Sequence, residues 1–285
     1  MNDPFISPDT SMARNFTPDA RPARGDDELA AHEAGILTAA MALLASYDKV
    51  VLSYSGGVDS GLLLTLLRPL RARFIVQWLN PGALPHEAEH VRKQAAGGPF
   101  FEIQSDREAA WRQHGLPTMV LPAFKAPGLA GDVPVKGQRL TANAACCATV
   151  RGFPAYQWLR ANGVGLVIHG QRRGEGSDLY ATDIAPAHWG PLALWTREEV
   201  ISRAIHHAVP LPRQYAEGFP ESFECAVCPA NLDARRLAFL KRHHPPLHAE
   251  TLRLARVVQN EVDRAHAWQR GVLEDAEAGG PFEKL

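Results

Sequence analysis

Two groups of residues in this chain of 285 have the types and spacing that chemistry needs. The first is the turn Ser55-Gly56-Gly57-Val58-Asp59-Ser60, which follows the apolar run 49–54. Glycines let a backbone approach an anion closely, and the N–H groups at the start of a helix attract negative charge. The turn therefore predicts a phosphate site. It lacks the lysine of a GxxxxGK[ST] loop, which argues against a kinase or GTPase.

The second group is the four cysteines, which occur as the adjacent pair Cys146-Cys147 and as the motif Cys225-Ala226-Val227-Cys228. Four cysteines are too few for a secreted disulfide scaffold, and grouped cysteines in a reducing compartment more often bind metal or do chemistry. Neither pair alone offers four ligands, so only the fold can bring them together. Four thiolates are the ligand set of an iron–sulfur cluster or of a structural zinc ion, and unligated thiols are the third alternative.

Alternating strands and helices must position these groups. Buried strands are predicted at 49–54, 74–79, 100–104 and 165–169, and helices at 28–47, 61–67, 85–93, 146–160, 196–207 and from 231 onward. This alternation predicts an α/β fold with a doubly wound, mostly parallel sheet and a helical C-terminal extension. Residues 1–27 lack apolar periodicity and are predicted to be a disordered arm, followed by a main domain at 28–232 and the extension at 233–285.

Overall charge says little about partners, because the net charge is -1 and the pI is about 6.9. The local basic stretch Arg235, Arg236, Lys241 and Arg242 is either a solvated helix face or a contact for nucleic acid. We see no apolar run of about 20 residues that would span a bilayer and no signal pattern at the N-terminus. We therefore expect a cytoplasmic protein without a membrane partner.

Several segments resemble one known family, in the order in which that family has them. The SGGVDS turn resembles the pyrophosphate loop (PP-loop) of the N-type ATP pyrophosphatases, which share an adenine nucleotide alpha hydrolase-like (HUP) fold. Other segments are similar to motifs of the phosphoadenylylsulfate (PAPS) reductases: 80–87 (NPGALPHE) to TGxxFPET, 146–151 (CCATVR) to CCxxRK, and 170–177 (GQRRGEGS) to GxRRxxS. The run from Pro191 to Gly218 is similar to their PLxxW and PxxYxxG segments.

This resemblance implies ATP and Mg²⁺ as ligands, with catalytic roles for Asp59, Arg172 and Arg173. The guanidinium group of an arginine can bind two oxygens of a phosphate or sulfate group at once. Adjacent cysteines with a distant CxxC resemble the ligand pattern of adenylylsulfate reductases, which favours a [4Fe–4S] cluster on Cys146, Cys147, Cys225 and Cys228 over zinc. The implied nucleotide-binding residues are Ser53, Ser55, Gly56, Gly57, Val58, Asp59, Ser60, Asn80, Gly82, Gly170, Arg172, Arg173 and Ser177.

The implied function is adenylation of a substrate with release of pyrophosphate, for sulfur transfer to DNA, RNA or a small molecule. The intact SGGxDS turn is similar to members that consume ATP, in particular the iron–sulfur enzymes of DNA phosphorothioation and related thiolation. A partner such as a cysteine desulfurase, or cluster-bound sulfide, would supply the sulfur. Sulfonucleotide reductases use a cysteine near the C-terminus, and this sequence has none after Cys228. The alternatives are therefore a PAPS or adenylylsulfate reductase that uses an external thiol, and a noncatalytic nucleotide or cluster sensor. The acceptor and the oligomeric state are left open.

Overall fold

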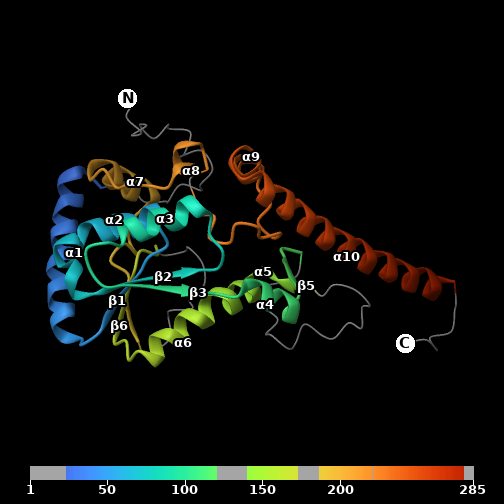
Figure 1. Cartoon of the computed structure of the whole chain (residues 1–285), viewed down its shortest axis with the longest axis horizontal. Coiled ribbons are helices and arrows are strands. Elements are labelled where there is room, and N and C mark those ends of the chain that lie inside the picture. The colour runs from blue at the N-terminus through green and yellow to red at the C-terminus, as the bar shows by residue number, and fades with distance from the viewer. Residues whose placement is uncertain (1–23, 121–139, 173–185, 220, 279–285) are drawn as a thin grey trace. The chain divides into compact units, whose positions relative to one another are not determined.

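The computed structural model describes residues 24–120, 140–172, 186–219 and 221–278 (Figure 1). Its helices and strands, in chain order, are α1 (Asp26–Ser46), β1 (Val50–Ser53), α2 (Val58–Leu66), the 3-10 helix η2 (Arg68–Arg73), β2 (Ile75–Asn80), α3 (Pro85–Gln94), β3 (Phe100–Gln104), α4 (Arg107–His114), β4 (Leu116–Thr118), β5 (Leu140–Ala142), α5 (Asn143–Cys147), the π-helical turn η3 (Ala148–Gly152), α6 (Phe153–Ala161), β6 (Leu166–His169), β7 (Ala187–Trp189), α7 (Arg197–His206), α8 (Arg213–Ala216), α9 (Ala234–His243) and α10 (Pro245–Glu277).

The chain divides into two compact units, Met1–Ser105 with Phe153–Cys225, and Asp106–Gly152 with Ala226–Leu285. The domain ranges 28–232 and 233–285 stay a prediction from the sequence. The predicted arm, 1–27, lies outside the described residues up to residue 23, and its last two residues are already the first turn of α1.

The first unit is built on a parallel sheet whose described strands have the order β3-β2-β1-β6-β7. Val51 of the central strand β1 pairs with Ile75 of β2 on one side and with Val167 of β6 on the other. The strands expected from the apolar runs are present, which confirms the α/β prediction. The strand β7 was not predicted, because Ala187–Trp189 is short and carries no apolar run. The chain reverses its winding between β1 and β6, and in open α/β sheets this switch point is where ligands bind.

Alternate side chains of each strand face opposite layers, which is why the strands read as continuous apolar runs. Val50 and Leu52 of β1 belong to a core cluster shared with α1, α2, α3 and α7. Val51 lies in a second cluster with Val167 of β6 and Leu159 of α6. Figure 1 shows α2 and α3 on one side of these strands and α6 on the other. The sheet is therefore covered on both faces, as the doubly wound prediction required.

Helix α1 is the one helix in the described part of the chain that is long and apolar enough, by length and composition, to cross a membrane. No such segment was expected from the sequence. One face of α1 is buried in the core of the first unit through Leu29, Ile36, Ala40 and Leu44. On the same face Glu33 is buried and accepts hydrogen bonds from Arg203 of α7 at 2.8 and 2.7 Å. These contacts account for α1 as a core helix of the α/β unit.

The second unit consists of helices around a short parallel pair, β4 with β5, in which Leu116 lies opposite Leu140. Helix α4 was not predicted, because its apolar periodicity is weak and only Trp111 is buried in it. The final helix α10 buries Thr251, Leu254 and Val258 in its first half. The predicted helical C-terminus is confirmed by α9 and α10.

Candidate functional site

The predicted phosphate loop joins the end of β1 to the start of α2. Both flanking elements are buried, so the loop leaves a rigid strand and enters a rigid helix. Gly56 has φ +82°, and a Cβ built there would lie 2.7 Å from the Cγ2 of Val91. A side chain at this position would be strained and would also collide with α3. Gly57 is the N-cap residue of α2, so the loop ends where the helix dipole is positive.

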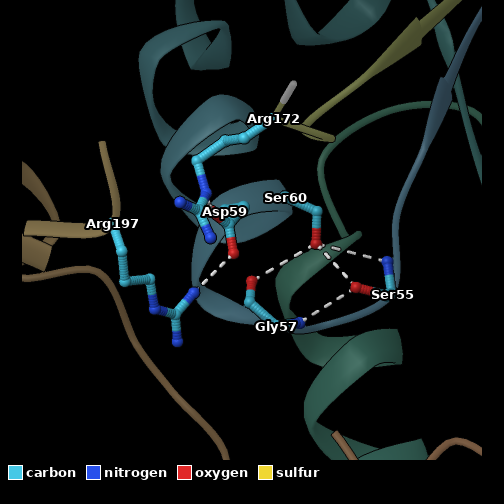
Figure 2. Close-up of polar contacts among 6 residues, drawn as sticks. All are labelled: Ser55, Gly57, Asp59, Ser60, Arg172 and Arg197. Carbon is cyan, nitrogen blue, oxygen red and sulfur yellow. Dashed lines mark hydrogen bonds and ion pairs between the residues drawn. The ribbon is translucent and has the colours of Figure 1, made fainter. Parts of the chain in front are cut away.

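Hydroxyl groups and backbone amides are interleaved within this loop (Figure 2). The backbone N–H of Ser55 donates to the Oγ of Ser60 at 3.3 Å, and the N–H of Gly57 donates to the Oγ of Ser55 at 3.3 Å. The two serine Oγ atoms are 3.1 Å apart, and the Oγ of Ser60 donates to the carbonyl of Gly57 at 3.2 Å. The serine hydroxyls therefore accept from amides that could otherwise donate to an anion. These hydrogen bonds give the loop a defined shape.

Asp59 is held between two arginines in the first turn of α2. The Nε of Arg172 donates to its Oδ1 at 3.1 Å, and an Nη of Arg197 donates to its Oδ2 at 2.8 Å. Figure 2 shows the two guanidinium groups converging on this one carboxylate. Both arginine side chains are largely buried, with exposed fractions of 9% and 12%. Two guanidinium groups therefore face one carboxylate at the helix N-terminus, and guanidinium groups at such a position are suited to bind phosphate or sulfate.

Two different elements deliver these arginines. Arg172 follows β6, and Gly170 between them packs directly on the first turn of α2: a Cβ there would lie 2.9 Å from the backbone C of Asp59 and 2.9 Å from the N of Ser60. Arg197 is the first residue of α7, whose N-cap Thr196 forms a capping box with Glu199. Arg172 was predicted from its motif, whereas Arg197 was not predicted. The one sequence feature that pointed to Arg197 was its place just after the PLxxW segment. A charged residue at the start of a helix is usually solvated, so this place did not suggest a binding site.

Asn80 and Gly82 lie at the carboxyl end of β2, the strand next to β1. The Oδ1 of Asn80 accepts from the N–H of Gly82 at 3.0 Å and from that of Ala83 at 2.9 Å, while its Nδ2 donates to Glu102 at 2.8 Å. Asn80 therefore shapes the turn after β2, and its contact with a nucleotide stays a prediction. Ser53, the last residue of β1, pairs in register with His169 of β6 at the same edge of the sheet. The predicted residues Arg173 and Ser177 lie outside the described residues.

Two histidines beside the loop are held in the neutral form. Burial, followed by the neighbouring His188, lowers the pKa of His169 to about 4. Burial, followed by the charges of His86 and Lys93, lowers the pKa of His90 to about 4. The Cδ2 of His90 is 3.7 Å from the position of a Cβ on Gly56, so His90 packs beneath the loop. At neutral pH the positive charge described at this site therefore comes from the arginines and the helix terminus.

The four cysteines are all described, and none forms a disulfide. On α5 the Sγ of Cys146 accepts a hydrogen bond from the indole N–H of Trp111 at 3.3 Å, and the Sγ of Cys147 donates to the Oδ1 of Asn143 at 3.8 Å. Cys146 and Cys228 are buried. Among the described residues, no group of three or more histidine, cysteine, aspartate or glutamate side chains is arranged to hold a metal ion. The geometry does not demonstrate a cluster site, and the cluster stays a prediction from the sequence.

The basic stretch after the CxxC motif is partly structural. Arg236 is buried and donates from an Nη to the carbonyl of Ala226 at 3.2 Å, inside the motif itself. The N-cap Asp233 accepts from the backbone N–H groups of Arg235 and Arg236 at 2.8 and 3.2 Å. Arg236 therefore holds the CxxC turn and is removed from any basic face. A nucleic-acid contact by the rest of the stretch stays a prediction.

Comparisons with known proteins agree with the motif resemblance. The family model of the phosphoadenosine phosphosulfate reductase domain matches residues 49–231. No curated protein matches the chain. The solved structures that match include two that are similar to this chain at a low level. A phosphoadenylyl-sulfate reductase from Candida auris in a phosphate complex has 13% identity and a TM-score of 0.45, covering 71% of this chain and 97% of that one. An NH3-dependent NAD synthetase from Campylobacter jejuni in complex with a nitrate ion has 20% identity and a TM-score of 0.45, covering 76% and 93%.

The family match spans well over half of the chain and includes β1, the phosphate loop, the adjacent cysteines, Arg172 and the CxxC motif. The resemblance inferred from short motifs is confirmed at the level of the family, while membership in an iron–sulfur thiolation subgroup stays a prediction. The protein belongs to the phosphoadenosine phosphosulfate reductase domain family.

Proposed function

We propose that this protein binds ATP at the Ser55–Ser60 loop and adenylates a substrate with release of pyrophosphate, in the service of sulfur transfer. The observation that carries the proposal is the arrangement around Asp59, where Arg172 and Arg197 converge at the N-terminus of α2. A buried pair of guanidinium groups beside a glycine turn is suited to a triphosphate, because charge builds up on the leaving pyrophosphate as the bond to the α-phosphorus breaks.

In the proposed reaction an oxygen of the acceptor attacks the α-phosphorus of ATP, and the bond from that phosphorus to the bridging oxygen of pyrophosphate breaks. The terminal sulfur of a partner's persulfide then attacks the activated carbon or phosphorus atom and AMP leaves. A thiol finally splits the resulting disulfide to free the thiolated product. Arg172 and Arg197 stabilise the leaving pyrophosphate, and Asp59 fixes their orientation. We place this activity in the cytoplasm, with DNA, RNA or a small molecule as acceptor.

Mg²⁺ is expected to enter with the nucleotide and to be held mainly by its phosphate oxygens. Both oxygens of Asp59 already accept from arginines, so this carboxylate is a poor first ligand for the ion in the geometry described. We propose a [4Fe–4S] cluster on Cys146, Cys147, Cys225 and Cys228 from the donor chemistry alone, with zinc as the alternative. No step of the reaction is assigned to it.

The family match favours a second candidate, reduction of adenylylsulfate or phosphoadenylylsulfate. In that reaction a thiolate from another chain attacks the sulfate sulfur, the nucleotide leaves, and a second thiol releases sulfite and forms a disulfide. The arginine pair suits a sulfonucleotide as well as ATP, since sulfate and phosphate present similar oxygens. The product therefore separates the two functions.

The test uses anaerobically purified protein. Pyrophosphate is measured after incubation with ATP, Mg²⁺ and candidate acceptors, and sulfite after incubation with each sulfonucleotide and a dithiol. Gly57→Val is the inactive control, because a Cβ there would lie 3.2 Å from the Oη of Tyr215 and 3.4 Å from the Oγ of Ser55, leaving no room for a branched side chain. Adenylation is supported if wild-type protein releases pyrophosphate and Gly57→Val does not. Sulfite without pyrophosphate supports the reductase, and nucleotide binding without either product supports a sensor.

The metal is tested separately from activity. Anaerobic protein with about four irons and four sulfides per chain, lost on serine substitution of any one cysteine, supports the cluster. Stoichiometric zinc without iron, or four free thiols in active protein, contradicts it.

A further inference from the structure

Tyr215 of α8 lies at the start of α2, far along the chain from the phosphate loop. Its side chain is buried, with 6% exposed. The Oη is 3.2 Å from the position that a Cβ on Gly57 would take, and the Oγ of Ser55 is 3.4 Å from the same position. The backbone N–H of Val58, the first residue of α2, is near enough to this oxygen to oppose the rise in its pKa that burial causes. The Tyr215 hydroxyl therefore lies at a helix N-terminus, where a phosphate oxygen commonly binds.

Hydroxyl groups surround the amides of the loop. The amides of Ser55 and Gly57 donate to serine hydroxyls, and that of Val58 lies near the tyrosine hydroxyl. A hydroxyl both accepts and donates, so it can accept from an amide in the free protein and donate to an anion when one is present. Burial raises the pKa of Tyr215, which keeps it in the protonated, donating form at neutral pH.

Neighbouring contacts hold Tyr215 in this position. The adjacent Gln214 is fully buried, and its Nε2 donates to the Oε1 of Glu87 in α3 at 2.5 Å. The same carboxylate oxygen accepts from the backbone N–H of Phe223 at 2.8 Å, and His86 bonds the amide oxygen of Gln214 at 2.8 Å. The short helix α8 is therefore anchored on both sides, and the hydroxyl is placed at the loop before any ligand arrives.

We propose that Tyr215 is a phosphate-binding residue of the nucleotide site. When a phosphate group enters, the tyrosine hydroxyl donates its hydrogen to a phosphate oxygen at the start of α2. This inference rests on the proposed function, since it takes the loop to be the site of a nucleotide's pyrophosphate part. It assigns a role to the PxxYxxG segment that the motif resemblance alone did not.

The test compares wild-type protein with Tyr215→Phe, using ATP and inorganic pyrophosphate as separate ligands in titration calorimetry. We expect binding of both ligands to weaken about tenfold, the usual effect of losing one hydrogen bond to a charged group. Tyr47→Phe is the matched control, because it removes a hydroxyl from a partly buried tyrosine that packs on Gly165 in the same unit, and it should leave both affinities unchanged. Amide chemical shifts of wild-type protein give a measurement that needs no variant: the Val58 amide should shift on addition of pyrophosphate.

Unchanged affinity in Tyr215→Phe, or a Val58 amide that pyrophosphate leaves in place, overturns the inference while the proposed function stands. Tighter binding also overturns it, since the hydroxyl would then only compete with the ligand. Wild-type protein that binds pyrophosphate but not ATP refutes the ATP assignment, and the pyrophosphate comparison still decides the role of Tyr215. Wild-type protein that binds neither ligand refutes both.

Discussion

Gly170→Ala should damage the phosphate site by adding a single methyl group. The new Cβ would lie 2.9 Å from the backbone C of Asp59, 2.9 Å from the N of Ser60 and 3.1 Å from the O of Asp59. Ordinary van der Waals contact begins at 3.4 Å, and every one of these neighbours is backbone. A flexible side chain could turn away, whereas the first turn of α2 can respond only by moving away from β6. The substitution therefore shifts the loop itself.

The magnitude follows from two opposing effects. Overpacking a well-packed site costs about 1–3 kcal/mol, and replacing glycine with alanine recovers about 0.4–1 kcal/mol by restricting the unfolded chain. The net expectation is a loss of about 1–2 kcal/mol in the free energy of unfolding. For a unit of this size the melting temperature should fall by roughly 2–8 °C. Affinity for ATP should fall as well, because the displaced turn carries Asp59 and the N–H groups of α2.

The assay is urea unfolding of the sheet-bearing unit together with ATP titration. Gly35→Ala is the matched control: it makes the same chemical change in α1, where nothing lies within 4 Å of the new methyl group. Because alanine favours a helix over glycine, Gly35→Ala should stabilise the protein by about 0.5–1 kcal/mol and leave ATP affinity unchanged. If Gly170→Ala matches wild-type protein in both stability and affinity, the close contact between β6 and α2 that we describe is wrong.

Arg197→Ala should weaken ATP binding about tenfold in calorimetry. The control Arg213→Ala removes an exposed ion pair with Glu217 and should leave ATP affinity unchanged. Equal effects of the two variants would refute the role of Arg197. The free energy of unfolding in urea should be constant above about pH 6.5 and should decline as the pH falls toward 4. The reason is that His90 and His169 bind protons in the unfolded chain at a higher pH than in the folded protein, where their pKa is about 4. Replacing both histidines with glutamine should make the decline less steep, and an unchanged slope would contradict this explanation. Glu33→Ala should cost about 3–5 kcal/mol in unfolding free energy, because among the described residues it leaves the buried Arg203 with Asp26 at 4.0 Å as its one acidic partner. A loss under about 1 kcal/mol would show that α1 is not anchored by this pair.

Local pattern was enough to predict the central strands, the turn between β1 and α2, and the family. Runs such as 49–54 are apolar without alternation, and only a strand covered on both faces requires this, so the parallel sheet could be read directly. Gly56 and Gly57 signalled a close approach of backbone to an anion, and the positive φ of Gly56 agrees with that interpretation. Asp59 and Arg172 were predicted because neighbouring residues placed them in recognisable motifs.

The rest of the site depended on contacts between distant segments. Arg197 looked like an ordinary charged residue at a helix start, and Tyr215 like one apolar residue of a short motif, yet the packing of α7 and α8 brings them to the start of α2. Gly170 is required by the backbone of Asp59 and Ser60, which no local pattern reveals. A sequence specifies which side chains are available, because helix and strand periodicity is local. Which of them meet at Asp59 is decided by the tertiary packing, since the energy of burying two guanidinium groups beside one carboxylate exists only once the strands and helices are in place.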